Sequence, residues 1–171
     1  HNADVLSDNL SNATAIGFDA FVSASNKIRL GNGGVTVIEG QVPFSNVSDE
    51  RFKYDIKNNV PGLDFIKKLK PVTYYIDTEK MDSFLKTGAI SNSKSTTSTN
   101  KQMSTGFLAQ EVVATAKELG YSFDGVHAPS NDKDYYSIAY SQFVMPLVKA
   151  VQEQQAIIET LEKRIKELEK R

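Results

Sequence analysis

The sequence predicts an α+β fold built from three successive parts. Three observations lead to this prediction. Residues 1–46 are rich in glycine, asparagine and short β-branched runs, residues 47–139 mix helical and strand patterns, and residues 140–171 carry an unbroken heptad repeat. A chain of 171 residues is long enough for one domain, or for two small modules and a tail. We expect the parts to meet near residues 46/47 and 139/140.

The first part is expected to form short strands joined by tight turns. Ile28 and Leu30 alternate with Lys27 and Arg29, which places the apolar pair on one face of a strand and the charged pair on the other. The GNGG run that follows predicts a turn. Strands this short bury little apolar surface, so the segment should be marginal as an isolated monomer and should require neighbours.

The second part is expected to contain both helices and strands. A helix is predicted between Pro61, which the first turn of a helix tolerates, and Pro71, which ends it. The VTYYI run at 72–76 is rich in β-branched and aromatic residues and therefore predicts a strand. Residues 79–86 are expected to form a short helix.

A polar segment then interrupts the pattern. Residues 91–105 contain a single apolar residue, Met103, and cannot bury enough surface to hold one conformation. We expect them to form a mobile loop. The pattern resumes with a strand expected at 106–109.

A further helix is predicted at 110–119, closed by Gly120. Gln110 and Glu111 belong to the run GFLAQEV and are expected to be structural, because an acid in the first turn of a helix is favoured by the helix dipole. A short strand is expected at 135–138.

The third part shows the strongest periodicity in the chain. A proline, Pro146, lies inside the repeat, so either a kink or a helix start is expected near it. A strict seam of two apolar residues in seven is narrower than a core-facing stripe, so we expect a parallel coiled coil between chains rather than a helix folded onto its own domain. The predicted seam is Val144, Leu147, Val151, Gln154, Ile158, Leu161, Ile165 and Leu168.

The number of helices in this coiled coil is not set by the heptads alone. β-branched residues at the first seam position with leucine at the second nominally favour dimers, and the polar Gln154 layer can set register or oligomeric state.

Composition excludes several classes of function. No apolar run approaches the roughly 20 residues of a membrane-spanning helix, and a net charge of −1 without a basic patch argues against nucleic acid or anionic membranes as partners. The chain contains no cysteine, hence no disulfide. We expect neither a metal nor a cofactor, and we expect Asp132 and Asp134 to belong to a polar loop. The abrupt start at His1 suggests a fragment of a longer chain.

The stretch VSDERFKY at 47–54 is the one candidate site for chemistry. Ser48 and Lys53 lie five residues apart with Asp49 directly after the serine. One interpretation is a polar turn or helix cap. The other is a self-cutting site, in which a lysine takes the serine's proton because burial favours the uncharged amine. The two histidines, His1 and His127, lie far away in the sequence.

Four runs give the chain a resemblance to a known family. SDERFKYDI, LDFIKKLKPVTYYI, GFLAQEV and YSQFVMPLVKAVQE occur in this order over most of the residues from Ser48 onward. Together they resemble the intramolecular chaperone domain at the C-terminus of endosialidase tailspikes, phage neck appendages and related fibre proteins. Upstream, SNATAIGFDAFVSASNKIRLGN resembles the head repeats of trimeric autotransporter adhesins.

The resemblance implies a homotrimer in which this domain registers three fibre chains, the upstream segment being its client. It further implies a trimeric β-roll or β-prism-like stalk at 1–46, a three-stranded coiled coil at 140–171, and a place on a phage fibre or a bacterial cell surface. In self-cleaving relatives a serine-lysine dyad cuts the chain and releases the domain. Ser48 and Lys53 match that dyad, and Asp49 then follows the scissile bond, or the cut lies one residue upstream.

Two alternatives stay open at this point. The chain is either a trimerisation chaperone that is also a single-turnover serine peptidase acting on itself, or a permanent, non-enzymatic trimerisation foot of an adhesin or phage fibre.

Overall fold

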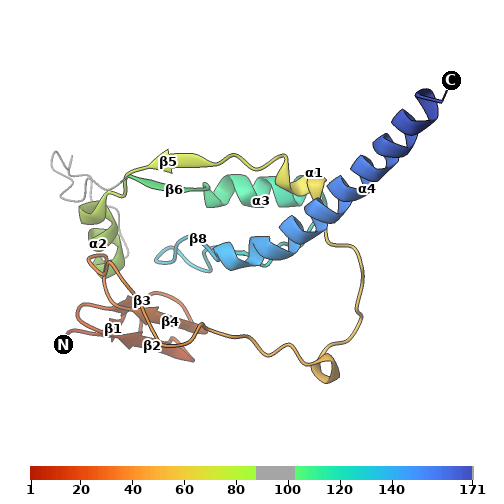
Figure 1. The fold of residues 1–171 in the computed structure, drawn as a ribbon. Helices are drawn as coiled ribbons and strands as arrows, with labels where there is room; N and C mark the ends of the chain where they lie inside the picture. Colours follow the sequence, from red (N-terminus) through yellow and green to blue (C-terminus); the bar gives the residue numbers. More distant parts are fainter. Residues whose placement is uncertain (88–102, 171) are drawn as a thin grey trace. The chain divides into compact units, whose positions relative to one another are not determined.

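The computed structural model describes residues 1–87 and 103–170. Among these residues it contains four two-stranded sheets, several short helices and one long C-terminal helix (Figure 1). The predicted α+β class is thereby confirmed. The chain divides into two compact units that do not follow its linear order. The first unit combines His1–Asn46, Thr73–Gly106 and Ala128–Tyr136, and the second combines Val47–Val72, Phe107–His127 and Ser137–Arg171.

The first unit begins with four short parallel-paired strands. β1 (Asp4–Val5) pairs with β3 (Phe21–Val22), and β2 (Ala13–Ile16) pairs with β4 (Lys27–Leu30). The strands are no longer than four residues, as the sequence predicted. Parallel pairing of neighbouring short strands stacks the chain in successive turns, so each strand stabilises the next.

A 14-residue repeat underlies the pairing of β2 with β4. The runs SNATAIG and SNKIRLG begin at Ser11 and Ser25, and the Asn12 side-chain amide donates a hydrogen bond to the Asn26 side-chain oxygen at 3.0 Å. Both asparagines adopt positive φ angles, of 51° and 57°. Asparagine tolerates this left-handed conformation better than most residues do, so the same corner recurs in each repeat.

The two faces of β4 have an unusual distribution of side chains. Lys27 and Arg29 are half-buried within the unit, whereas Ile28 and Leu30 are 67% and 40% exposed. The predicted alternation is confirmed, with the charged face inward and the apolar face toward solvent.

The remainder of the first unit comes from two later segments. β5 (Val72–Tyr74) pairs with β6 (Ser104–Gly106), and α2 (Thr78–Thr87) matches the helix expected at 79–86. Most of the loop expected at 91–105 lies outside the described residues. Its last residues, however, form part of β6, because they find strand partners in β5.

The strand expected at 106–109 is wrong in position, since β6 ends at Gly106. The strand ends there because the backbone N–H of Phe107 donates to the hydroxyl of Tyr140 at 3.0 Å. This N–H is therefore not used to extend the pairing of β6 with β5.

The second unit has an aromatic core. Phe65, Val112, Ala116 and Phe143 are buried, and the ring of Phe123 lies 5.1 Å from Phe65 and 4.8 Å from Phe143. The four buried residues come from α1 (Leu63–Ile66), α3 (Ala109–Glu118) and the η2 turn (Tyr140–Phe143), and Phe123 comes from the loop after α3. β7 (Val126–His127) and β8 (Ser137–Ile138) pair beside it as an antiparallel hairpin.

Two predicted helices of this unit have different outcomes. α3 matches the helix expected at 110–119 within one residue at each end, and Gly120 closes it with a φ of +62°. The helix expected between Pro61 and Pro71 is shorter than predicted. From Lys68 onward the backbone amides bond three residues back instead of four, as in Leu69 N–H to Ile66 C=O, which tightens the chain into turns.

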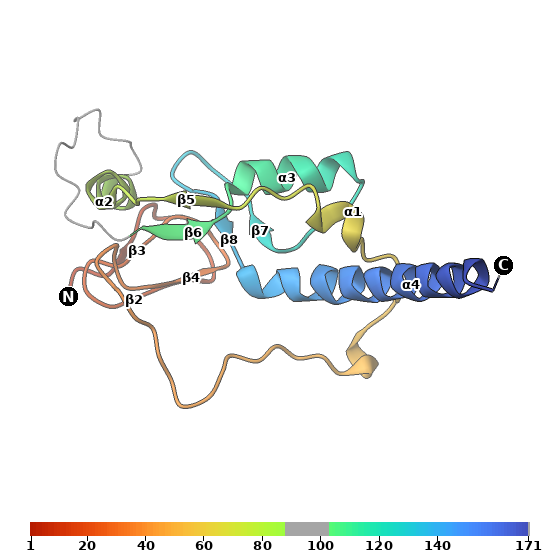
Figure 2. The same ribbon diagram turned by 45° about the horizontal axis from the view of Figure 1, so that its top comes forward.

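The long helix α4 (Val144–Leu168) begins two residues before Pro146. The proline therefore lies in the first turn, where it is tolerated. Pro146 and Ala150 are buried, and this face packs against α1 (Figure 2). All residues from 154 to 170 are exposed.

Candidate functional site

The stretch VSDERFKY folds into a single tight turn. Its centre is η1 (Glu50–Phe52), and Asp49 is the N-cap, whose side-chain oxygen accepts the backbone N–H of Arg51 at 2.9 Å. The N–H of Lys53 closes the turn by donating to the carbonyl of Glu50 at 3.0 Å. The capping role considered for Asp49 is thus confirmed.

This turn brings the two candidate residues together. The amine nitrogen Nζ of Lys53 lies 2.7 Å from the hydroxyl oxygen Oγ of Ser48. The contact follows from the local geometry, because one helical turn between the two residues folds the lysine back toward the serine. A serine and a lysine at this distance can exchange a proton directly.

Asp49 is engaged by Arg51 and not by Ser48 or Lys53. The guanidinium of Arg51 binds the carboxylate with Nη2 at 2.6 Å from Oδ2 and Nε at 3.0 Å from Oδ1. The side-chain bond from Arg51 is the main cause that lowers the pKa of Asp49, and the backbone N–H of Arg51 adds to it. The same contact raises the pKa of Arg51. Asp49 therefore braces the turn as a charged acceptor.

The turn lies among exposed apolar side chains. Phe44 is 94% exposed, Val47 81%, Phe52 71% and Tyr54 92%, and Ser48 and Lys53 are exposed as well. A lysine amine accepts a proton only in its uncharged form, which burial favours. The single chain supplies the contact between the two residues without supplying that burial.

The predicted seam of α4 is exposed along its whole length. Ile158 is 48% exposed and Leu161 is 54% exposed, and the polar Gln154 is exposed too. The remaining seam residues, Val144, Leu147, Val151, Ile165 and Leu168, are between 46% and 62% exposed. The chain's own unit is packed on a different face of the helix, the one carrying Pro146 and Ala150.

A residue that was not predicted from the sequence, Glu153, joins α4 to α1. Glu153 accepts the backbone N–H of Leu63 at 2.8 Å through Oε2 and so caps the start of α1. Nothing local to α1 points to this cap, because the two residues are 90 positions apart.

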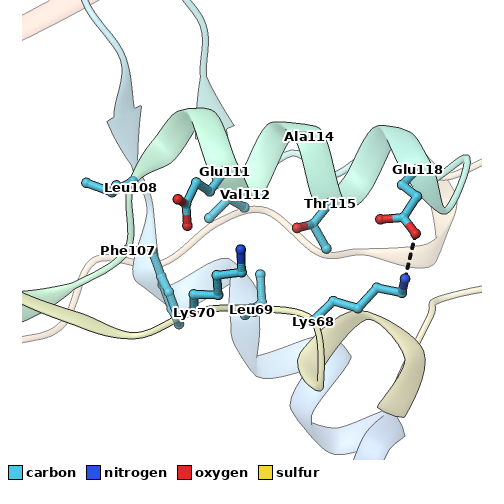
Figure 3. A pocket seen from close by; sticks show the side chains of 10 residues that line it. All are labelled: Lys68, Leu69, Lys70, Phe107, Leu108, Glu111, Val112, Ala114, Thr115 and Glu118. Atoms are coloured by element: carbon cyan, nitrogen blue, oxygen red, sulfur yellow. Dashed lines mark hydrogen bonds and ion pairs between the residues drawn. The ribbon is translucent and has the colours of Figure 1, made fainter.

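A groove of about 250 Å³ lies beside α3. Its floor is apolar, and in Figure 3 Lys70 and Glu111 extend toward its middle from opposite walls. Lys68 Nζ and Glu118 Oε1 form an ion pair across it at 2.6 Å (Figure 3). Glu111 lies in the first turn of α3, where the sequence analysis expected it.

Metal-binding clusters and membrane-spanning helices are both absent from the described residues, 1–87 and 103–170. Among them no cluster of three or more histidine, cysteine or acidic side chains could hold a metal ion. No helix in this part of the chain combines the length and the apolar character needed to cross a membrane.

Comparison with known proteins identifies part of the chain. Residues 48–121 match the family model Peptidase_S74, described as Chaperone of endosialidase. No curated protein matches the chain. The matched range begins at Ser48 and contains three of the four runs on which the resemblance was drawn, SDERFKYDI, LDFIKKLKPVTYYI and GFLAQEV. The match over residues 48–121 therefore supports the resemblance to the intramolecular chaperone domain of endosialidases.

Proposed function

We propose that this chain is an intramolecular chaperone that brings three copies of a fibre or adhesin protein into register, and that Ser48 and Lys53 cut the chain after assembly. The observation that carries the proposal is the exposed seam of α4 in a chain whose residues 48–121 match the family model of the endosialidase chaperone. A soluble protein rarely leaves a continuous apolar stripe without a partner. Three parallel copies of α4 would bury the seam as a coiled coil.

The physical need for such a device follows from the upstream segment. Contacts between chains require search and alignment before they stabilise anything, and unpaired strand edges invite aggregation meanwhile. A coiled coil forms from local contacts and raises the effective concentration of the attached segments toward the millimolar range. The outward apolar face of β4, with Ile28 and Leu30 exposed, is then available to the neighbouring chains.

The same proposal accounts for the exposed dyad. In the assembled protein, neighbouring copies would cover Ser48 and Lys53 together with the apolar side chains around them. Burial then favours the uncharged amine of Lys53, which takes the proton of the Ser48 hydroxyl across the 2.7 Å contact. Cleavage then follows from assembly. Once the covalent link to the chaperone segment is cut, a fibre that unfolds cannot be realigned by it, so the fibre is stabilised by slow unfolding and not by a reversible equilibrium.

The cut consumes one water. Hydrolysis between Ser48 and Asp49 adds the hydroxyl of water to the carbonyl carbon of Ser48 and a hydrogen to the nitrogen of Asp49. An acyl shift from the amide of Ser48 to its hydroxyl would instead end the upstream fragment at Val47. Sequencing the N-terminus of the downstream fragment separates these routes, because it begins with Asp49 in the first case and with Ser48 in the second.

The site of action follows from the family and the upstream segment. Chaperone domains of this family serve phage fibres, and residues 1–46 resemble the heads of bacterial surface adhesins. We therefore place the assembled protein on a virion fibre or on a bacterial cell surface, with the upstream segment of the same chain as the client.

Incubation of the purified protein tests the cut. We expect a fragment boundary at Ser48 in the parent protein and an intact chain in Ser48→Ala and Lys53→Ala. Intact mass measured under native and denaturing conditions reports assembly and scission in one experiment. A fully trimeric preparation that yields no fragment rules out the peptidase.

That outcome would favour the second candidate, a permanent trimerisation foot without enzymatic activity. The observation in its favour is the exposure of Ser48 and Lys53 in the single chain. Sedimentation equilibrium tests what both candidates share. We expect three times the 18.9 kDa of one chain, and a stable mass near 18.9 kDa at high concentration would remove both.

A further inference from the structure

The first compact unit extends across the proposed cut. It consists of His1–Asn46, which precede Ser48, and of Thr73–Gly106 and Ala128–Tyr136, which follow it. Hydrolysis next to Ser48 would therefore divide this unit between two fragments without removing any of its internal contacts. Whether the fragments then separate depends on what joins the three segments.

The strongest connection is a buried polar cluster at Asp134. Its side chain has no exposed surface, and Oδ1 accepts Lys27 Nζ at 2.7 Å and Ser23 Oγ at 3.1 Å. Oδ2 accepts the backbone N–H of Ser130 at 3.1 Å. The Lys27 side chain is only 18% exposed and its amine lies 4.1 Å from the ring centre of Tyr135. Residues before the cut thus neutralise a buried charge after it.

Further bonds run between the same segments. Asn131 Nδ2 donates to the carbonyl of Ser23 at 3.0 Å, and Lys133 Nζ donates to the carbonyl of Leu6 at 2.8 Å. Arg29 Nη1 donates to the hydroxyl of Tyr135 at 2.9 Å. The loop at 128–136 therefore binds the strands through both their side chains and their backbone.

α2 adds a second set of contacts. It packs against β3, and Asp82 accepts the backbone N–H of Gly33 at 3.2 Å. Lys86 forms an ion pair with Asp19 at 3.1 Å. In and beside β3, Ala20, Val22 and Ala24 are at most 2% exposed, so this unit contains apolar burial as well as polar contacts.

We infer that cutting the chain at Ser48 does not release the chaperone domain: the two fragments stay bound through the Asp134 cluster and the contacts of α2. The inference rests on the proposed function for its cut, and it goes further by assigning the fate of the products. Separation would break the ion pair and hydrogen bonds of Asp134 together with the ion pair of Lys86 and the packing of α2 against β3. A substitution that removes Lys27 while the fragments are still bound would leave the Asp134 charge buried and unpaired, and this penalty is much larger than that of losing an exposed pair.

The test uses a cut made by an added protease, so that it does not depend on self-cleavage. A recognition sequence for a site-specific protease replaces residues 42–46, which are exposed and lie outside helices and strands, in a Ser48→Ala background. After digestion the protein is passed over a sizing column in native buffer. We expect both fragments to elute together and to separate only in denaturant. Fragments that separate in native buffer overturn the inference.

Variants identify the contacts responsible. In the nicked protein, Lys27→Met should speed dissociation of the fragments by roughly a hundredfold, the scale expected for an uncompensated buried charge. Lys57→Met is the matched control, because Lys57 forms an exposed ion pair with Asp55 on the downstream side of the cut, and its fragments should stay together. Equal dissociation rates for these two variants would remove the Asp134 cluster from the inference.

Because Lys27→Met leaves a buried charge unpaired in the uncut chain as well, Lys133→Ala is nicked in parallel. It removes only the exposed bond to the carbonyl of Leu6, and a modest acceleration is expected. Failure of the proposed self-cleavage has a different signature: the parent protein stays intact on incubation while the protease-nicked fragments still co-elute.

Discussion

At the scale of single residues, Asp49 and Arg51 determine how Ser48 and Lys53 meet. The carboxylate of Asp49 caps the η1 turn and is bound by the guanidinium of Arg51. This contact fixes the path of the chain over the four residues that separate the candidate nucleophile from its base. The carboxylate next to the serine is thus a brace for the turn, and the lysine is left as the group in contact with the hydroxyl.

The Asp49 brace predicts a pH dependence. Hydrogen bonds from Arg51 hold the folded-state pKa of Asp49 below the ordinary 3.8. A lowered pKa means that the brace stabilises the turn fully above about 3.8 and is lost as the pH falls through the lower folded value. We expect an NMR titration of the Asp49 carboxyl to show this low pKa, and Arg51→Gln to raise it toward 3.8. An unchanged titration in Arg51→Gln would contradict the brace.

Gly62 predicts a local effect on stability. A Cβ at this position would lie 2.6 Å from Glu153 Oε2 and 2.8 Å from the backbone nitrogen of Ala150. Gly62→Ala should therefore push α1 away from α4 and destabilise the unit by about 1–3 kcal/mol, as overpacking usually does. Gly40→Ala is the matched control, since its nearest contact would be an ordinary 3.7 Å. Thermal unfolding followed by circular dichroism compares the two, and equal melting temperatures would show that α1 yields without cost.

At the scale of elements, one face of α4 packs against its own unit and another face carries the exposed seam. Pro146 and Ala150 attach the helix to its own unit, while the seam containing Ile158 and Leu161 remains exposed. A helix that used its seam internally could not also register three chains. Under the proposed function, this division allows each chain to fold first and to assemble with its copies afterwards.

This division predicts that an aspartate disrupts assembly when it is placed in the seam of α4 and not when it is placed outside the seam. Ile158→Asp would put three carboxylates into one layer of a parallel three-stranded coiled coil, and we expect it to convert the proposed trimer to monomers. Thr160→Asp places the same charge on an exposed outer position of α4 and should leave the mass unchanged. Sedimentation equilibrium measures both. Assembly that survives Ile158→Asp would show that the seam is not what holds the copies together.

The elements also show what the sequence could and could not predict. α3 and α4 were predictable because heptad spacing and a closing Gly120 are local signals. The contact of Ser48 with Lys53 was compatible with their spacing, but only the turn geometry establishes it. The inward face of β4 was not predictable, since Lys27 is buried by pairing with Asp134 across 107 positions. Asp134 itself was assigned to a polar loop, because a long-range partner leaves no trace in local pattern.

At the scale of the whole molecule, the order of the chain and the order of its compact units differ. The first unit takes two of its three segments from residues downstream of Ser48, so the upstream strands fold against part of the chaperone domain itself. Under the proposed function, client and chaperone would then share one compact unit, and correct packing of residues 1–46 would be coupled to the state of the downstream segments. A cut at Ser48 would break the covalent link between residues 1–46 and the downstream segments without breaking the noncovalent contacts between them.

The last prediction joins assembly to chemistry. Ser48 and Lys53 are already in contact within one chain, yet both are exposed there. In the proposed mechanism, neighbouring copies supply the burial that favours an uncharged lysine. A variant that cannot assemble should therefore not cut itself. We expect Ile158→Asp, with its dyad unaltered, to remain intact on incubation while the Thr160→Asp trimer is cut like the parent. Dilution of the parent below its assembly concentration should stop cleavage in the same way. Intact mass over time follows both experiments, and a monomeric Ile158→Asp that cuts at the parental rate would show that the turn alone suffices for the reaction.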